Sequence, residues 1–248
     1  MKADPARALA EAVALFNAGR VAEALQHCER ALGAAPQDAG LQQLQATLLL
    51  VQGDAAAALA AIAPVLARHP THAPARRVAT RATLRRGAEL IAQGRPQDAV
   101  PLLTDLSARE PDLAEAWHEL GRALQASRRP AEAQAAGLRA TALAPELAPA
   151  WFALALACED MHRPAEAAAA LRRALALDAS QVEAWLNLGL LEQQLGRLDA
   201  ALDCHARAWH LRPALLGRIA MALCSQRCGA VWLDADGLEQ ELRRRASA

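Results

Sequence analysis

The chain has 248 residues, 54% of them apolar and 22% charged, and its 27 basic residues balance its 27 acidic ones. This composition excludes a disordered tail, which would be less apolar, and a general nucleic-acid binder, which needs a basic excess to displace phosphate counterions. Alanine makes up roughly a quarter of the residues and favours helices over strands, so the composition predicts an all-α chain.

Six segments, taken from the N-terminus, each predict a pair of antiparallel helices. They cover residues of about 5–38, 39–72, 73–113, 114–147, 148–181 and 182–215. The pattern is clearest in the last three segments, where Trp117, Trp151 and Trp185 recur at positions i, i+34 and i+68. Relative to each tryptophan, an alanine stands at i+16 and another at i+23. Small residues let two helices approach closely, so this spacing predicts repeated helix pairs that stack on one another.

The turn inside each pair needs a residue in the left-handed backbone conformation, which glycine adopts without a steric penalty. Glycine is available near four of the turns, at Gly19, Gly53, Gly94 and Gly196. In the other two pairs Arg128 and His162 replace that glycine, and a proline opens the helix that follows.

The third segment is longer than the others, because the interval from Pro70 to Pro111 exceeds the interval from Pro36 to Pro70 by seven positions. Seven residues are two helical turns, so the first helix of this pair can lengthen, to about 75–93, without rotating its face. The alternative is a loop at 71–79 with a local break in the stack.

The tail, residues 216–248, departs from the repeat. Residues 216–228 predict a helix, 229–233 a turn and 237–245 a last helix, which Asp236 and Glu239 would open as a capping box. We interpret the tail as degenerate capping helices that solvate the end of the stack. The alternative is a partner-specific motif or a junction to a further domain.

The repeat resembles the tetratricopeptide repeat (TPR) family, whose unit of about 34 residues carries Trp, Leu-Gly, two small residues and a closing Pro. The resemblance covers residues 5–215. It implies a right-handed α-solenoid of about six units in which the first helix of each pair, here the A helix, lines a concave groove. The second helix is here the B helix. The resemblance also implies a protein that binds other proteins and has no chemistry of its own.

The resemblance assigns the groove to fixed positions of the A helices. The residues that we expect to bind a partner are Arg81, Arg85, His118, Glu119, Arg122, Gln125, Phe152, Leu156, Glu159 and Asn187. Leu186 and Gln193 fall at lining positions too.

Charges concentrate in the middle of this expected groove. Arg77, Arg81 and Arg85 are four residues apart and form one basic stripe along the long helix. Equivalent positions of successive units lie side by side, so Arg81 should neighbour Glu115 and Arg85 should neighbour Glu119. These pairs either satisfy one another or form a recognition patch for a peptide with apolar and acidic groups.

The leading hypothesis for function is a non-enzymatic interaction module that binds a partner peptide or helix in the groove. The alternative is a regulatory or assembly subunit of an enzyme or secretion complex, which docks through the tail and the convex face. The sequence has no Gly-rich phosphate loop, no Gly-x-Ser-x-Gly and no His-Glu-x-x-His, so no enzyme activity is expected.

A metal or redox site is a further alternative, since Cys204, His205, His210, Cys224 and Cys228 cluster in the sequence. Zinc takes four such ligands in a tetrahedron, but Cys204 and His205 are adjacent and point in different directions from one helix. Free cysteine commonly behaves as a small buried apolar residue. We therefore expect no metal and no cofactor.

The sequence also bears on location and assembly. Charged residues interrupt any signal-peptide apolar region at the N-terminus, and the longest uncharged stretches, residues 55–67 and 147–158, are too short to span a bilayer. Five cysteines are an odd number without a paired framework, which is typical of a reducing compartment. We expect a cytoplasmic monomer that neither inserts into membranes nor binds nucleic acid.

Overall fold

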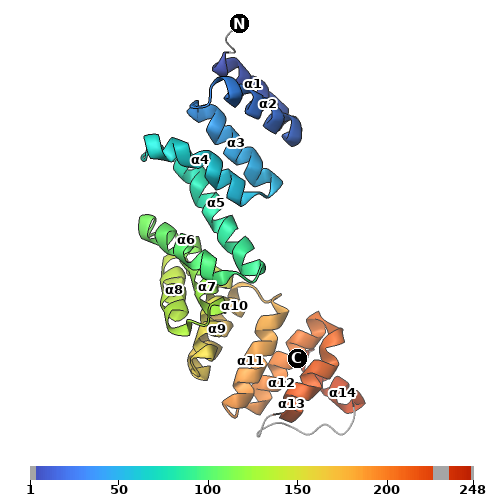
Figure 1. The fold of residues 1–248 in the computed structure, drawn as a ribbon. Helices are drawn as coiled ribbons and strands as arrows, with labels where there is room; N and C mark the ends of the chain where they lie inside the picture. Colours follow the sequence, from blue (N-terminus) through green and yellow to red (C-terminus); the bar gives the residue numbers. More distant parts are fainter. Residues whose placement is uncertain (1–3, 226–234, 247–248) are drawn as a thin grey trace. The chain divides into compact units, whose positions relative to one another are not determined.

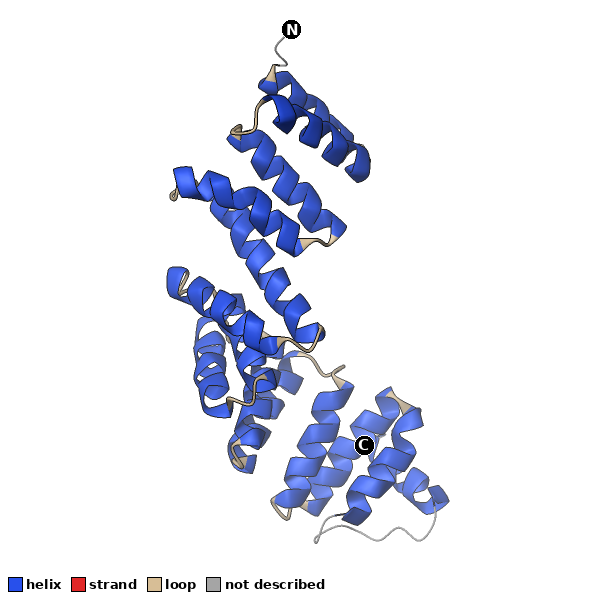
Figure 2. Cartoon of the chain, viewed as in Figure 1, coloured by secondary structure: helices blue, strands red, loops and turns tan. Residues whose placement is uncertain are grey.

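A computed structural model describes residues 4–225 and 235–246 of the chain (Figure 1). Within these residues all regular secondary structure is helical (Figure 2), which confirms the all-α prediction. None of the helices in this part of the chain is long and apolar enough to cross a membrane.

The structure forms two compact units, Met1–Arg109 and Glu110–Ala248. The first unit holds three helix pairs in its described part, in which each helix packs on the next. Its helices are α1 (Pro5–Asn17), α2 (Val21–Ala34), α3 (Ala39–Gln52), α4 (Ala55–Arg68), α5 (Ala73–Ala92) and α6 (Pro96–Arg109). The A helices α1, α3 and α5 also contact one another in succession, as the stacking of repeats requires.

The second unit continues the repeat and includes the tail. Its helix pairs are α7 (Ala114–Ala126) with α8 (Pro130–Leu143), α9 (Ala148–Asp160) with α10 (Pro164–Leu177), and α11 (Val182–Gln194) with α12 (Leu198–Leu211). A 3₁₀ turn (Pro213–Leu215) then leads to α13 (Leu216–Ser225) and α14 (Ala235–Ala246). The predicted turn at 229–233, Cys228 and Trp232 lie outside the described residues.

Helix α5 confirms the prediction that the seven extra residues lengthen the first helix of the third pair. Helix α5 has 20 residues, whereas the other A helices have 13 or 14. His72 caps its start, since the ring Nδ1 accepts a hydrogen bond from the backbone N–H of Ala75 at 3.2 Å. The insertion is therefore helix and not loop.

Left-handed residues close the turns within the six described pairs. The four glycines have φ between 72° and 92°, while Arg128 and His162 have φ of 59° and 57°. A side chain at positive φ costs roughly 1 kcal/mol because the Cβ atom crowds the following carbonyl oxygen. The repeat imposes this conformation even where glycine is absent.

The two helices of a pair meet at a small residue of the A helix. A Cβ atom on Gly87 would lie 2.8 Å from Leu103 Cδ1, and one on Gly189 would lie 2.5 Å from His205 Cε1. Gly121 is different, since the nearest atom to its added Cβ would be a carbonyl oxygen at 3.5 Å. The reason is Gly137, which occupies the B-helix position that Leu103 and His205 fill in other repeats.

The repeated tryptophans link each A helix to the loop before it. The indole N–H groups of Trp117, Trp151 and Trp185 each donate to the carbonyl oxygen six residues earlier, at 2.9 Å. The acceptor is a proline carbonyl in the first two cases and that of Ala179 in the third. Because the acceptor is backbone, the contact does not depend on the proline ring.

One buried carboxylate ties three helices together. Glu192 of α11 is 1% exposed and accepts from Arg172 of α10 and, at 2.6 Å, from Arg197 at the start of α12. Both arginines are half exposed, so in these two ion pairs the carboxylate lies in the core and its partners reach the surface.

The tail covers the end of the second unit. Trp209 packs with Ile219 of α13 and with Leu238 and Leu242 of α14 in one buried cluster. Arg245 adds a polar clamp, because its guanidinium donates to Asp203 at 2.7 Å and to Asp199 and Glu241 as well. The tail helices therefore shield an apolar surface that α12 would otherwise expose.

Candidate partner-binding surface

Two successive A helices of the second unit carry most of the predicted site residues in matching stripes. His118, Arg122 and Gln125 lie on α7 at positions i, i+4 and i+7, so they share one face of that helix. Phe152, Leu156 and Glu159 lie on α9 with the same spacing and at equivalent positions of the next repeat. All six side chains are partly exposed, and α7 contacts α9 directly. We call these six residues the A-helix face.

Two opposite charges on α7, those of Glu119 and Arg122, satisfy each other within the helix. Arg122 donates to both carboxylate oxygens of Glu119, at 2.9 and 3.0 Å. His118 Nε2 lies 3.8 Å from the same carboxylate, and burial lowers the pKa of His118. Its Nδ1 atom is buried and has no hydrogen-bond partner among the described residues. The pair of Arg122 and Glu119 is thus already formed before any partner binds.

The next polar contact joins the two helices. The side-chain amide of Gln125 donates to Asp160 at 3.5 Å, which links the C-terminal end of α7 to that of α9. Glu159 stands next to Asp160, but its carboxylate makes no hydrogen bond or ion pair with any described residue. Burial, and secondarily the charge of Asp160, raises the pKa of Glu159.

On α11, two residues that were predicted to line the groove are buried, so the prediction was wrong for them. Leu186 and Gln193 are 3% and 1% exposed because α13 packs over them. The Gln193 amide donates to the carbonyl oxygens of Ala222 and Leu223, at 3.3 and 3.2 Å. Asn187 stays partly exposed beside them. Helix α13 of the tail therefore covers part of the face that was predicted to bind a partner in the last repeat.

The first unit presents the predicted arginine stripe on α5. Arg77, Arg81 and Arg85 are all exposed, and neither Arg77 nor Arg81 has a partner among the described residues. Arg85 pairs with Glu89 of its own helix at 3.2 Å. The expected pairs of Arg81 with Glu115 and Arg85 with Glu119 would join the two units, and they stay predictions.

The two units differ in charge. Residues 1–109 contain 12 basic and 9 acidic residues, for a net charge of +3, whereas residues 110–248 contain 15 and 18, for a net charge of −3. The overall neutrality of the chain thus hides a basic first unit and an acidic second unit. A surface on either unit is expected to prefer ligands of the opposite sign.

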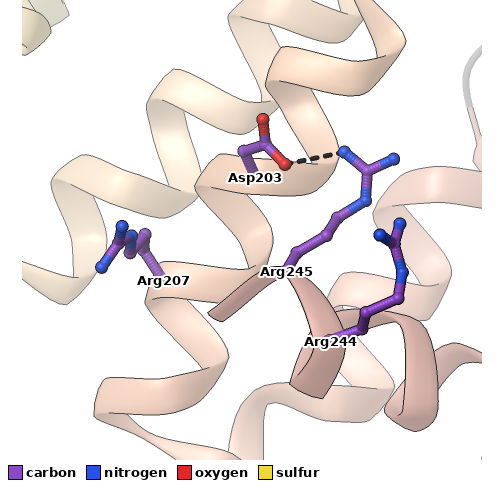
Figure 3. Close-up of a pocket in the computed structure, with 4 residues that line it drawn as sticks. All are labelled: Asp203, Arg207, Arg244 and Arg245. Atoms are coloured by element: carbon purple, nitrogen blue, oxygen red, sulfur yellow. Dashed lines mark hydrogen bonds and ion pairs between the residues drawn. The ribbon is translucent and has the colours of Figure 1, made fainter. Parts of the chain in front are cut away.

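A polar pocket that the sequence analysis did not anticipate lies between α12 and α14 (Figure 3). It has a volume of about 400 Å³ and is lined by Asp203, Arg207, Arg244 and Arg245. Arg245 points toward Asp203, with which it pairs, while the guanidinium group of Arg207 points away from Arg244 and Arg245 (Figure 3). Arg244 is held by Glu241 at 2.6 Å. Two of the three guanidinium groups are therefore already matched by carboxylates.

The cysteines and histidines do not assemble into a metal site in the described part of the chain, where no three potential ligands lie together. Cys204 and His205 are buried in the core of α12, and burial raises the pKa of the Cys204 thiol to about 12. Cys224 is exposed, and Cys228 lies outside the described residues.

Stacked helix pairs with small residues at their crossings, left-handed turns and a repeating tryptophan define a helical repeat protein. Models of the tetratricopeptide repeat match residues 3–39, 90–158, 148–191 and 182–209. The chain belongs to the tetratricopeptide repeat family.

Solved structures show the same fold. A crystal structure of MamA is 24% identical, covers 68% of this chain and 95% of its own length, and has a TM-score of 0.57. MamA from Desulfovibrio magneticus RS-1 is 22% identical over 73% of this chain and 99% of its own, with a TM-score of 0.58. YrrB, described as a TPR protein with an unusual peptide-binding site, is 18% identical over 80% and 96%, with a TM-score of 0.61. No curated protein matches the sequence.

Proposed function

We propose that this protein is a non-enzymatic interaction module that holds a peptide segment or a helix of a partner protein against its A helices. The observation that carries the proposal is the A-helix face, where apolar and charged side chains stay partly exposed at the same positions of two adjoining repeats. YrrB, a protein of similar fold, is described as having a peptide-binding site, which supports the proposal that this fold binds a peptide here. The proposal includes that the protein is located in the cytoplasm and acts as a monomer.

The arginines of α5 fit the same function in the first unit. Arg77 and Arg81 are exposed and have no partner among the described residues, and a guanidinium group recognises a carboxylate through two parallel hydrogen bonds. A partner segment with acidic side chains is the ligand that these two residues would select.

A second candidate is docking through the outer surface by an assembly or regulatory subunit. Large apolar side chains are exposed on the B helices and the tail. Among them are Leu138 (54% exposed), Leu177 (41%), Leu211 (43%) and Met221 (75%). Exposed apolar residues of this kind mark interaction surfaces where they are contiguous.

Capture of partners from a lysate of the source cell, followed by mass spectrometry, tests both candidates. The groove variant is Arg81→Glu with Arg85→Glu. Its matched control is Arg30→Glu with Arg95→Glu, which reverses two exposed charges of the same unit, one on the B helix α2 and one in the turn between α5 and α6. The outer-surface variant is Met221→Glu, which replaces an exposed residue and leaves the packing of the tail intact.

The outcomes separate the candidates. A partner that is lost with the groove variant and kept with its control supports binding at the A helices. A partner that is lost only with Met221→Glu supports docking through the tail. A partner that binds all variants equally contradicts binding at the α5 arginines and docking at Met221, provided that circular dichroism shows unchanged helicity.

A further inference from the structure

Glu159 differs in residue type from its counterparts in both neighbouring repeats. The equivalent residues are Gln125 in the repeat before it and Gln193 in the repeat after it. Both glutamines donate to the A helix that follows, Gln125 to Asp160 of α9 and Gln193 to the carbonyl oxygens of α13. A carboxylate has the shape of the amide but no N–H to donate. Glu159 accordingly makes no such contact with the helix that follows it.

The surroundings of Glu159 supply no cation within the described residues. The nearest charged side chain along α9 is Asp160, and the arginine of the A-helix face, Arg122, is engaged by both oxygens of Glu119. Helices α7 and α9 together carry Glu115, Glu119, Glu159 and Asp160 against Arg122 alone, a net charge of −3. A partly buried carboxylate without a partner is costly, since burial removes water that would solvate the charge.

The other two residues that α9 contributes to the A-helix face are apolar. Phe152 and Leu156 precede Glu159 on the same face of α9, at i−7 and i−3, and both are partly exposed. Phe152 packs against the buried core of the second unit, so the position of its ring is fixed from below. A ligand that crosses this face would meet two apolar side chains and then a carboxylate.

We infer that the A-helix face of the second unit binds a partner segment with a lysine or arginine side chain that pairs with Glu159, next to an apolar side chain that covers Phe152 and Leu156. This inference rests on the proposed function and adds the chemistry of the partner. It assigns the opposite charge preference to that of the α5 arginines, in agreement with the net charges of the two units.

A random library of dodecapeptides displayed on phage provides the probe, with the full chain as bait. The test variant is Glu159→Gln, which restores the residue type of both neighbouring repeats and is expected to fold at least as well as the natural chain. The matched control is Glu146→Gln, which removes the same charge at an exposed site just before α9, about 20 Å along the helix axis from Glu159.

The expected result is enrichment of Lys or Arg near an aromatic or aliphatic residue with the natural chain and with Glu146→Gln, but not with Glu159→Gln. One enriched peptide is then synthesised with its basic residue and with glutamine in that place. The basic residue should raise the affinity for the natural chain at least tenfold and should leave the affinity for Glu159→Gln nearly unchanged, because the charged pair exists only in the first case.

Two other results would overturn the inference. Enriched peptides that are acidic or uncharged, or that bind Glu159→Gln equally well, refute the charged pair and leave the interaction function standing. If the natural chain enriches no peptide above the level of beads without bait, then the proposed peptide-binding function fails together with the inference.

Discussion

Alanine at three equivalent glycines should have effects of opposite sign on stability. Gly87, Gly121 and Gly189 occupy the same position of three A helices, so the motif alone predicts one common effect. At Gly189 the new methyl group would meet the imidazole ring of His205 at 2.5 Å, and at Gly87 it would meet Leu103 at 2.8 Å. At Gly121 its nearest neighbour would be at 3.5 Å, which is an ordinary van der Waals contact.

The magnitudes follow from two terms. Alanine is favoured over glycine inside a helix by about 1 kcal/mol, and overpacking a tight core costs about 1–3 kcal/mol. Gly121→Ala carries only the first term and should stabilise the chain by about 0.5–1 kcal/mol. Gly189→Ala carries both, and because its contact is the shortest of the three, an overpacking cost of about 2–3 kcal/mol leaves a net destabilisation of about 1–2 kcal/mol. Gly87→Ala should fall between them, because the terminal methyl groups of Leu103 can shift more readily than a ring.

Urea unfolding followed by circular dichroism measures these differences, and hydrogen exchange of the α7 and α11 amides assigns them to each repeat. The control is His205→Ala, which removes the ring that the new methyl group would strike. In that background Gly189→Ala should become stabilising, like Gly121→Ala. Equal destabilisation by Gly121→Ala and Gly189→Ala would refute the argument, since the motif and not the local packing would then decide the outcome.

Three further predictions concern strain and charge. Replacing Arg128 or His162 by glycine should stabilise the chain by about 0.5–1 kcal/mol, because glycine relieves the positive φ, and an unchanged or lower Tm would contradict the strain. His205 is buried without a partner among the described residues and burial lowers its pKa to about 4, whereas a pKa near 6.5 is expected when the chain is unfolded. The unfolded chain therefore binds the extra proton between these values, so up to about 3 kcal/mol of stability present above pH 6.5 should be lost as the pH falls toward 4, and His205→Leu should flatten this part of the urea-midpoint profile. Alanine at both arginine partners of Glu192 should cost about 3–5 kcal/mol in urea unfolding, whereas Glu192→Leu should cost much less, because only the first change leaves a buried charge unpaired.

The helical register could be predicted from the sequence because it depends on local, repeated chemistry. The regular spacing of the tryptophans locates the pairs, and the glycines locate the turns. The insertion could not be resolved in this way, since Pro74 is compatible both with the first turn of a longer helix and with a loop. The structure settles it as helix α5.

The candidate surface was less predictable because it depends on what covers it. Leu186 and Gln193 occupy lining positions by register, yet α13 packs over both, and a degenerate tail gives no pattern from which that contact could be read. Glu119 finds its partner three residues away on its own helix, and a spacing rule for neighbours within a helix would have indicated Arg122. Glu159 differs from Gln125 and Gln193 by one atom type, and only the contacts of those glutamines give that difference a meaning.

The position of α13 constrains how this protein could change its length through gene duplication. Helix α13 packs on α11 and covers side chains that remain partly exposed at the equivalent positions of α9, so it occupies the place of a seventh A helix. Arg245 then fastens α14 to α12 through Asp199 and Asp203, while Glu241 of its own helix holds the same guanidinium group. A copied repeat inserted at 181/182 would meet an interface of the kind that it already makes with its neighbours. The same repeat appended after α14 would follow the three arginines in the last turn of that helix, and it would find the face of α11 already covered by α13. The array can therefore lengthen from within by the contacts that its repeats already make, whereas a new A helix next to α11 would have to displace α13.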